Sequence, residues 1–315
     1  MSTLVDGDCL VDTYLTNPIF SDEGLAIAYL ESVRWRRSRS CPKCGERERT
    51  SLTKSKNHRP GLYYCNGCRK TFTVTVGTLF HGSKVPLNKW LLVFHLMVAS
   101  KKGMSALQVQ RMINVSYNTA WFMCHRVREA MTPTPKELEK KLGGRNKVVE
   151  VDETYWGNRG KLPPGARGYA HKMKVVSMVE RNGDKRSFHV PDVKAKTVVP
   201  LIKQHVNSKT RMMTDEASIY KHLHLDFASH ETVVHSAREY VRGDVTTNTI
   251  ESSFALVKRS LRGTFHQVSE KHLHRYLKEL DYKWNTRDMS DGLRLRNALK
   301  RADGKTLSRW ALKNR

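Results

Sequence analysis

The sequence predicts an α/β fold, a mixed sheet with flanking helices, preceded by a zinc ribbon and a helix-turn-helix. Three observations carry this prediction: two Cys-x-x-Cys pairs separated by 20 residues, two short helical patterns joined by a tight turn, and β-branched segments alternating with helical ones beyond residue 145. We expect five parts, namely an N-terminal helical segment (1–39), the ribbon (40–80), the helix-turn-helix region (81–135), the α/β domain (145–290) and a basic tail (291–315).

The ribbon is predicted from four cysteines, Cys41, Cys44, Cys65 and Cys68. Each Cys-x-x-Cys turn presents two thiolates to one side, so two such turns suit one tetrahedral Zn²⁺. Disulfides are the alternative, but a reducing cytosol disfavours them. A redox Cys-x-x-Cys would be a single pair beside a βαβ pattern. The spacing therefore indicates one structural Zn²⁺, held beside strands expected at 62–64 and 70–76.

The charge of the chain points to an anionic partner. Its 56 Lys and Arg residues exceed its 30 Asp and Glu residues, giving a net charge of +26. Solubility alone needs a magnitude of about 2–8 in a small domain. The basic residues are spread along the chain rather than gathered on one amphipathic helix, which favours double-stranded DNA over a membrane surface. No run of 18 apolar residues and no secretory signal is present, so we expect a cytoplasmic, DNA-associated protein without a membrane partner.

The helix-turn-helix is predicted over 105–131. A first helix begins at Ser105, a turn follows at 114–115, and Ser116 caps a second helix that carries an apolar stripe. An ordinary helical hairpin is the alternative, and the basic charge favours DNA reading. Helix-turn-helix proteins read bases with the N-terminal end of the second helix. The residues expected to contact DNA are Tyr117, Asn118 and Thr119 at that end, with Arg126 further along.

The α/β domain is predicted from short apolar segments, in which strand patterns and helix patterns alternate along the chain. Strands are expected at 148–151, 171–180, 187–190, 211–214 and 232–234, and helices at 197–206, 248–261 and 271–284. The Asn-Gly pair at 182–183 indicates a hairpin between the second and third strands.

Three acidic residues lie where these elements end or begin. Asp152 is expected to end the first strand, Asp215 to end the fourth, and Glu251 to lie in the first turn of the helix from 248. The adjacent acids, Glu153 and Glu216, would point to opposite faces. Three converging carboxylates would hold two Mg²⁺ or Mn²⁺ ions, as in-line phosphoryl displacement requires. The alternative is a helix-capping role for Glu251 and plain surface charges at the two strand ends.

The motifs around these residues resemble those of DDE-type insertion-sequence transposases of the ISXO-like, Merlin-related kind. The similar segments, within about residues 20–290, are Cys-Pro-Lys-Cys-Gly (41–45), Tyr-Tyr-Cys-Asn-Gly-Cys-Arg-Lys-Thr-Phe-Thr (63–73), Gly-Thr-Leu-Phe (77–80), Val-Asp-Glu-Thr-Tyr-Trp-Gly (151–157), Thr-Asp-Glu (214–216), Val-His-Ser (234–236), Asn-Thr-Ile-Glu-Ser-Ser-Phe-Ala-Leu-Val-Lys-Arg (248–259) and Leu-Arg-Gly-Thr-Phe-His (261–266).

The resemblance implies an RNase H-like catalytic domain in which Asp152, Asp215 and Glu251 bind two metal ions. Lys258, seven positions after Glu251 on the same helix face, and Arg259 would meet DNA phosphates. Two further residues, Asn248 and His235, would support the site.

The function implied is that of a DNA transposase. It would bind the inverted-repeat ends of an insertion sequence as a homo-oligomer, cleave them, and transfer the 3′-hydroxyl strand to target DNA by two-metal phosphoryl transfer. Two alternatives stay open: a catalytically inactive zinc-ribbon and helix-turn-helix regulator, and an RNase H-fold nuclease or resolvase.

Overall fold

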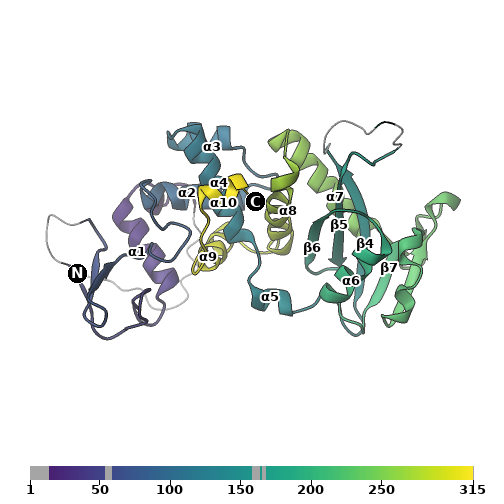
Figure 1. Ribbon diagram of the computed structural model, residues 1–315, viewed down its shortest axis with the longest axis horizontal. Coiled ribbons are helices and arrows are strands. Elements are labelled where there is room, and N and C mark those ends of the chain that lie inside the picture. Colours follow the sequence, from purple (N-terminus) through teal and green to yellow (C-terminus); the bar gives the residue numbers. More distant parts are fainter. Residues whose placement is uncertain (1–13, 54–58, 158–163, 165–167, 315) are drawn as a thin grey trace. The chain divides into compact units, whose positions relative to one another are not determined.

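The structure, a computed structural model, describes residues 14–53, 59–157, 164 and 168–314 (Figure 1). It divides into two compact units. The N-terminal unit comprises 1–131 together with 288–315, and the central unit comprises 132–287. No helix of the described residues is long and apolar enough to cross a membrane.

The N-terminal unit contains a small three-stranded sheet and a group of helices. Its elements are η1 (Pro18–Phe20), α1 (Glu23–Arg34), β1 (Thr50–Leu52), β2 (Tyr63–Cys65), β3 (Lys70–Phe72), α2 (Leu87–Ala99), α3 (Ala106–Ile113), α4 (Tyr117–Met131), α9 (Asp291–Arg301) and α10 (Arg309–Asn314). The sheet is antiparallel in the order β1-β2-β3. The strand expected over 70–76 therefore ends early, at Phe72.

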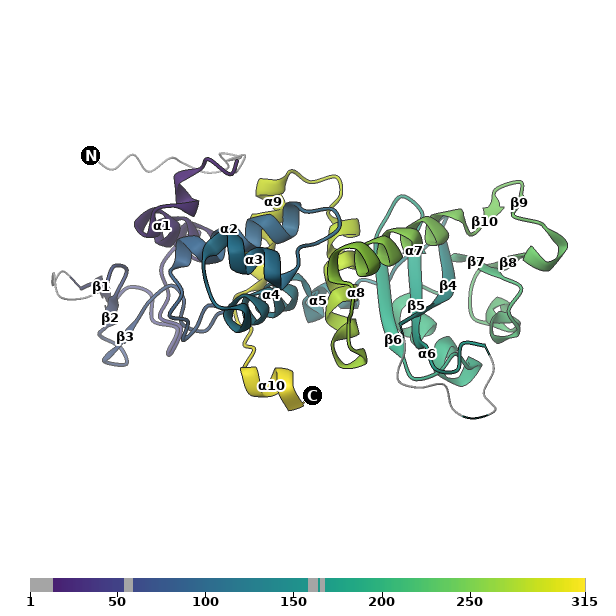
Figure 2. The ribbon, with the colours of Figure 1, turned by 90° about the horizontal axis from the view of Figure 1, so that it is seen from above.

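The expectation of a separate basic tail over 291–315 is wrong. Residues Asp291–Arg301 form α9, which packs against α2 in the N-terminal unit (Figure 2). The apolar side of α9 is buried through Leu295, Ala298 and Leu299. The apolar residues of this helix are spaced for one buried face, and its partner lies about 200 residues earlier in the chain.

Local signals fix the ends of α3 and α4. The Ser105 side chain accepts a hydrogen bond from the Gln108 N–H (3.1 Å) and begins α3. Asn114 ends that helix in the left-handed conformation, with φ 50°. The apolar stripe expected in the second helix is buried in α4, as at Met123 and Val127. The structure thus contains two helices joined by a short turn where they were predicted.

The central unit is built on a five-stranded mixed sheet. Its elements are α5 (Pro135–Glu139), β4 (Val148–Trp156), β5 (Met173–Glu180), β6 (Lys185–Val190), α6 (Ala195–His205), β7 (Arg211–Asp215), η2 (Ser218–Tyr220), η3 (Leu223–Leu225), β8 (Ser229–Val233), η4 (His235–Ala237), β9 (Val241–Arg242), β10 (Val245–Thr246), α7 (Asn248–Ser260), η5 (Leu261–Phe265) and α8 (Glu270–Asn285). The order is β6-β5-β4-β7-β8. The β4–β5 and β5–β6 pairs are antiparallel, whereas β4–β7 and β7–β8 are parallel. This mixed sheet with flanking helices fits the RNase H-like fold that the resemblance implies.

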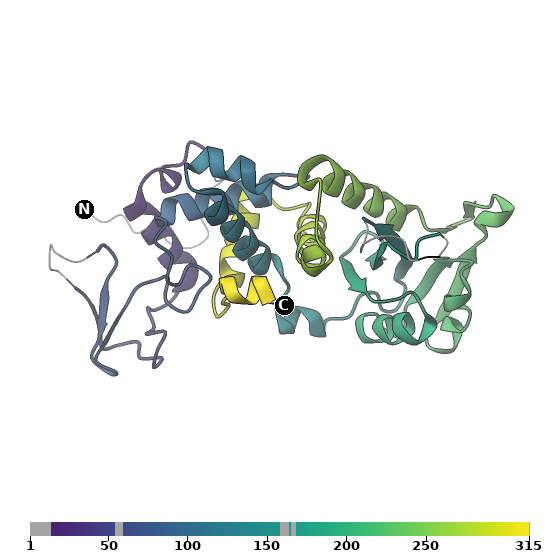
Figure 3. The ribbon, with the colours of Figure 1, turned by 45° about the horizontal axis from the view of Figure 1, so that its top comes forward.

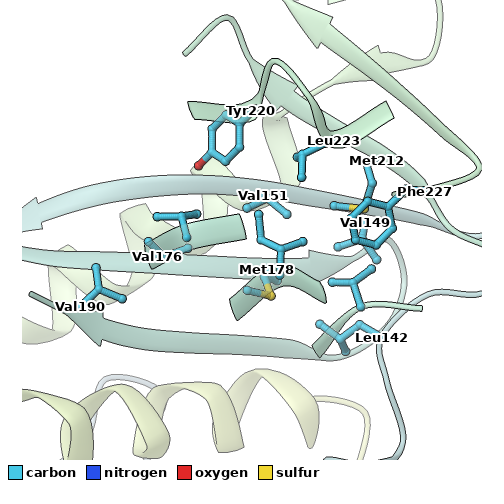
Figure 4. Close-up of a cluster of buried hydrophobic side chains, with 13 residues drawn as sticks. Leu142, Val149, Val151, Val176, Met178, Val190, Met212, Tyr220, Leu223 and Phe227 are labelled. Atoms are coloured by element: carbon cyan, nitrogen blue, oxygen red, sulfur yellow. The ribbon is translucent and has the colours of Figure 1, made fainter. Parts of the chain in front are cut away.

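Helices cover both faces of this sheet (Figure 3). On one face Val149 and Val151 of β4 pack with Ile202 of α6, in the cluster drawn in Figure 4. On the other face Val175 of β5 packs with residues of α7 and α8, such as Leu277. Since side chains alternate along a strand, neighbouring residues of β4 face different helices.

The strand β4 is longer than predicted. It continues through Asp152 to Trp156, so Asp152 lies in the middle of the strand and the prediction that it ends the strand is wrong. The cause is pairing with β5, which runs from Val149↔Glu180 through Asp152↔Ser177 to Trp156↔Met173. The strand β7 ends at Asp215, as expected.

Candidate functional site

The four predicted cysteines converge in the N-terminal unit. Cys41 Sγ lies 3.8 Å from Cys68 Sγ, and Cys44 Sγ lies 3.6 Å from Cys65 Sγ. All four sulfur atoms are within 4.8 Å of one another. Zn–S bonds of about 2.3 Å in a tetrahedron place the sulfur atoms about 3.8 Å apart. The arrangement therefore fits one Zn²⁺ ion bound by four thiolates.

The protein around these sulfur atoms favours metal binding. A hydrogen bond from the Cys68 backbone N–H lowers the pKa of the Cys65 thiol, whereas the pKa of Cys44, which the Glu46 backbone lowers, is raised to about 12 by burial and the other three thiols. A cation at this place would stabilise all four cysteines as thiolates. Apolar packing beside the site is limited to a small cluster in which Tyr63 stacks on Phe72 (5.6 Å between ring centroids) and Trp35 meets both rings edge-on. So small a core needs an additional stabilising contribution, which a bound zinc would supply.

The three predicted acids come from three elements of the central unit. Asp152 is on β4, Asp215 ends β7, and Glu251 is in the first turn of α7. The parallel pairing of β4 with β7 reaches Glu150↔Met213, so Asp152 and Asp215 are each two residues further along. The two aspartates therefore lie level with each other on adjacent strands, where β7 ends and β4 continues. The three carboxylates are not close enough to one another to bind the same single ion. Among the residues that the structure describes, only the four cysteines form a group of three or more such ligands.

Electrostatic coupling links these carboxylates. Burial, and then the negative charges of Asp215, Glu153 and Glu251, raise the pKa of Asp152 to about 7. Burial also raises the pKa of Asp215, although its Oδ1 accepts a hydrogen bond from the Ala217 N–H (3.1 Å). Carboxylates that repel one another in this way are stabilised by a cation. The donor set thus fits hard divalent ions.

The acids adjacent in sequence have other partners, as the alternation of side chains predicts. Glu153 Oε2 accepts a hydrogen bond from the hydroxyl of the buried Tyr220 (2.7 Å), which belongs to the α6 face of the sheet. Glu216 accepts backbone N–H bonds from His235 and Ser236, both at 2.9 Å, and these lower its pKa to about 2. Glu153 and Glu216 are therefore engaged in structural contacts.

Glu251 contacts one residue of its own turn and one of another loop. Its Oε1 accepts a hydrogen bond from the Thr247 hydroxyl (2.9 Å) and lies 3.7 Å from His235 Nε2. Its side chain is 48 % exposed. The capping alternative for this residue is not observed, because α7 begins at Asn248 and the Thr247 side chain at its N-cap accepts no hydrogen bond from a backbone N–H of the helix. Asn248 is exposed at the first position of the helix.

Glu150, which no sequence motif indicated, is fully buried on β4. Its Oε2 accepts the backbone N–H of Ile250 (2.9 Å) in the first turn of α7, and its Oε1 accepts from Arg181 Nε (2.7 Å). The Arg181 guanidinium also donates to the backbone oxygens of Asp244 and Thr246. A carboxylate at a helix N-terminus is stabilised by the helix dipole and by the unpaired N–H groups. Glu150 therefore fixes the start of α7, where Glu251 lies.

The exposed side of α7 carries cations. Glu251 and Lys258 follow at positions i and i+7 of α7, which lie along one helix face, and Arg262 comes after them in η5. Lys258 is half-buried and Arg259 is exposed. At the end of the helix, the Arg262 guanidinium lies over the Trp156 ring (5.8 Å to the centroid).

The residues predicted to read DNA differ in their surroundings. Tyr117 and Asn118 are exposed and Thr119 is half-exposed at the start of α4. Arg126 is engaged by the protein itself, because it donates to the backbone oxygen of Leu307 (3.3 Å) and lies over the Phe122 ring (4.5 Å). The start of α4 is therefore exposed, whereas Arg126 has structural partners.

Comparison with known proteins finds matches to two segments of the chain and to one relative of most of its length. Residues 141–285 match the ISXO2-like transposase domain, and residues 21–71 match the transposase zinc-ribbon domain. The chain is 31 % identical over 261 residues to an uncharacterized protein in transposable element ISH50 of Halobacterium salinarum, covering 77 % of this chain and 84 % of that protein. A crystal structure of the Mos1 strand transfer complex matches 64 % of this chain and 78 % of that chain at 14 % identity, but its TM-score of 0.20 is too low to support an argument.

The match to the Halobacterium protein covers most of both chains, and the two domain matches lie between residues 21 and 285. The chain belongs to the ISXO2-like family of insertion-sequence transposases that carry an N-terminal zinc ribbon.

Proposed function

We propose that this protein is a DNA transposase that cleaves the inverted-repeat ends of its element and joins the freed 3′-hydroxyl to target DNA. The observation that carries the proposal is the electrostatic coupling of Asp152, Asp215 and Glu251, which come from two adjacent parallel strands and one helix. Membership of a transposase family supports the same function.

The three carboxylates would hold two Mg²⁺ or Mn²⁺ ions. Such ions activate the attacking oxygen and support the leaving oxygen of an in-line displacement at phosphorus. Asp152 would be one of the ligands, because the charges of Asp215 and Glu251 both act on it. The contact of Glu150 with the Ile250 N–H and the Thr247 hydroxyl would hold Glu251 in position for this role.

The rest of the chain would bind and orient DNA. Lys258 and Arg259 would contact phosphates next to the carboxylates, with Asn248 and His235 beside Glu251. The zinc ribbon and the start of α4 would recognise the end sequence, since a helix N-terminus can reach base edges in the major groove. The net charge of +26 suits extended phosphate contacts, and we expect a homo-oligomer on DNA.

One experiment separates this function from its rivals. The full-length protein is incubated with DNA that flanks its coding region, target plasmid and Mg²⁺, and the products are sequenced. A transposase gives cuts at the element ends and joined 3′ ends in the plasmid. Cuts without joining would indicate a nuclease or resolvase, and specific binding without cuts in Mg²⁺ or Mn²⁺ would indicate a regulator.

A further inference from the structure

An exposed tyrosine lies beside Glu251, where the chain enters the short hairpin that leads into α7. The Tyr240 ring is 58 % exposed, and its centroid is 5.4 Å from the centroid of the His235 ring. His235 Nε2 lies in turn 3.7 Å from Glu251 Oε1. The next residue, Val241, begins β9 and is also exposed. An open aromatic ring and a neighbouring apolar side chain therefore lie close to one of the three candidate metal ligands.

The hairpin that follows Tyr240 is firmly attached to the sheet. Its strands β9 and β10 are antiparallel, and β10 leads into α7 (Figure 2). Val245 of β10 is buried against Val233 of β8. The Arg181 guanidinium donates to the backbone oxygens of Asp244 and Thr246. These contacts fix the hairpin relative to the sheet and to the first turn of α7, so the position of Tyr240 beside Glu251 follows from the fold.

Packing does not account for the exposed side of this hairpin. Neither Tyr240 nor Val241 belongs to a buried cluster of the central unit, whereas Val245 on the paired strand does. Single exposed apolar residues are common on protein surfaces. This tyrosine differs from such residues because it is held in place beside a candidate metal ligand.

The turn before Tyr240 carries a positive charge that is open to solvent. Arg238 ends η4 in the left-handed conformation (φ 58°), and its N–H donates to the His235 carbonyl (2.9 Å). Its side chain is exposed, and within the described part of the chain no acidic group pairs with it. Arg242, by contrast, pairs with Glu239 (3.5 Å). Arg238 is therefore available to a phosphate next to the exposed ring.

We propose that Tyr240 stacks on an unpaired nucleobase of the DNA held at the carboxylates, next to the phosphate that is attacked. The proposal rests on the proposed function for the identity of that DNA. Every base has a flat aromatic face, so a tyrosine holds a base without reading its sequence. Val241 would pack beside the same base, and Arg238 would contact a neighbouring phosphate. The stacked base would hold the strand in register with Glu251.

The test uses DNA that does not contain the ends of the element. A blunt duplex is compared with the same duplex carrying a three-nucleotide unpaired 3′ overhang that contains 2-aminopurine. Binding to the full-length protein in Mg²⁺ is measured by anisotropy, and stacking by quenching of 2-aminopurine fluorescence. The wild type should prefer the overhang and quench the fluorophore. Quenching should be weaker in EDTA, because carboxylates without a cation repel the strand.

The variants separate stacking from folding. Tyr240→Ala, at an exposed position, should reduce affinity for the overhang duplex about 5–150-fold and lose the quenching, whereas Tyr240→Trp should keep both. Tyr169→Ala, which removes another exposed tyrosine of the central unit, is the matched control and should change neither. Circular dichroism checks that each variant is folded.

Three results would overturn the proposal. They are a wild type without preference for the overhang, a Tyr240→Ala variant that binds and quenches like the wild type, and quenching of equal strength in EDTA, which would place the base away from the carboxylates. If the protein cleaves and joins flanking DNA but gives one of these results, the role of Tyr240 is wrong while the proposed function stands. Quenching that depends on Tyr240 and Mg²⁺ in a protein that never cuts DNA would support the stacking role and refute the proposed function.

Discussion

Replacement of Arg181 by methionine should leave the buried carboxylate of Glu150 without its ion-pair partner. The Glu150 side chain is 0 % exposed and that of Arg181 is 22 % exposed. Removing one partner of a buried pair costs about 3–5 kcal/mol, because the remaining charge is left uncompensated. We therefore expect Arg181→Met to lower the free energy of unfolding by about 3–5 kcal/mol.

Removing the charge of Glu150 instead should lower the free energy of unfolding by less. In Glu150→Gln, Arg181 keeps its hydrogen bonds to the backbone oxygens of Asp244 and Thr246 and is partly solvated, so we expect a loss of about 1–2 kcal/mol. The double variant has no charge left at this buried pair and should be more stable than Arg181→Met alone. The Arg181→Met cost should thus be reduced when Glu150 is also neutral.

Urea denaturation followed by circular dichroism measures these differences. A matched control is Arg211→Met, since Arg211 pairs with Glu231 and Asp244 near the surface (2.8 Å from Nε to Glu231 Oε1) and should cost about 0–1 kcal/mol. The reasoning would be refuted if the double variant lost the sum of the two single losses, or if Arg181→Met cost no more than the control.

Three further predictions concern the zinc site, a buried lysine and the start of α4. Cys65→Ser should reduce zinc from about one ion per chain to nearly none by metal analysis, and a full equivalent in the variant would contradict the four-thiolate site. Burial lowers the pKa of Lys185 to about 8, so its folded form releases a proton before its unfolded form does. Stability should therefore rise between about pH 8 and 10.5, by about 3 kcal/mol in total, and Lys185→Met should flatten that rise in urea titrations. Asn118→Ala should lose about 1–3 kcal/mol of preference for end over scrambled duplex, and an unchanged binding ratio would remove α4 from base reading.

Features defined by nearby residues could be predicted from the sequence. The cysteine spacing gave the four thiolates that converge within 4.8 Å, and the cap at Ser105 gave the start of α3. The alternation along β4 also separated Asp152 from Glu153 correctly, as the bond of Glu153 to Tyr220 shows. Each of these depends on the preferences of a few neighbouring residues.

Features that depend on distant partners could not be predicted. The strand β4 passes through the polar residues Asp152–Thr154 because β5 pairs with it along its length. Glu150 reads as one polar residue in an apolar segment, and its partners, Arg181 and the Ile250 N–H, are 31 and 100 residues away. In the sequence, α9 resembles a charged tail. Its apolar side is buried only because α2, far away in the chain, packs against it.

Binding of Mn²⁺ tests most directly the claim that Asp152, Asp215 and Glu251 form a metal site. Free Mn²⁺ is measured by electron paramagnetic resonance during titration of the zinc-loaded, full-length protein at pH 8, where Asp152, with a pKa of about 7, is ionised. The wild type should bind Mn²⁺, Asp152→Asn should lose that binding, and Glu153→Gln, which alters the neighbouring acid on the opposite face, should retain it. Equal Mn²⁺ binding by Asp152→Asn and the wild type would contradict the account.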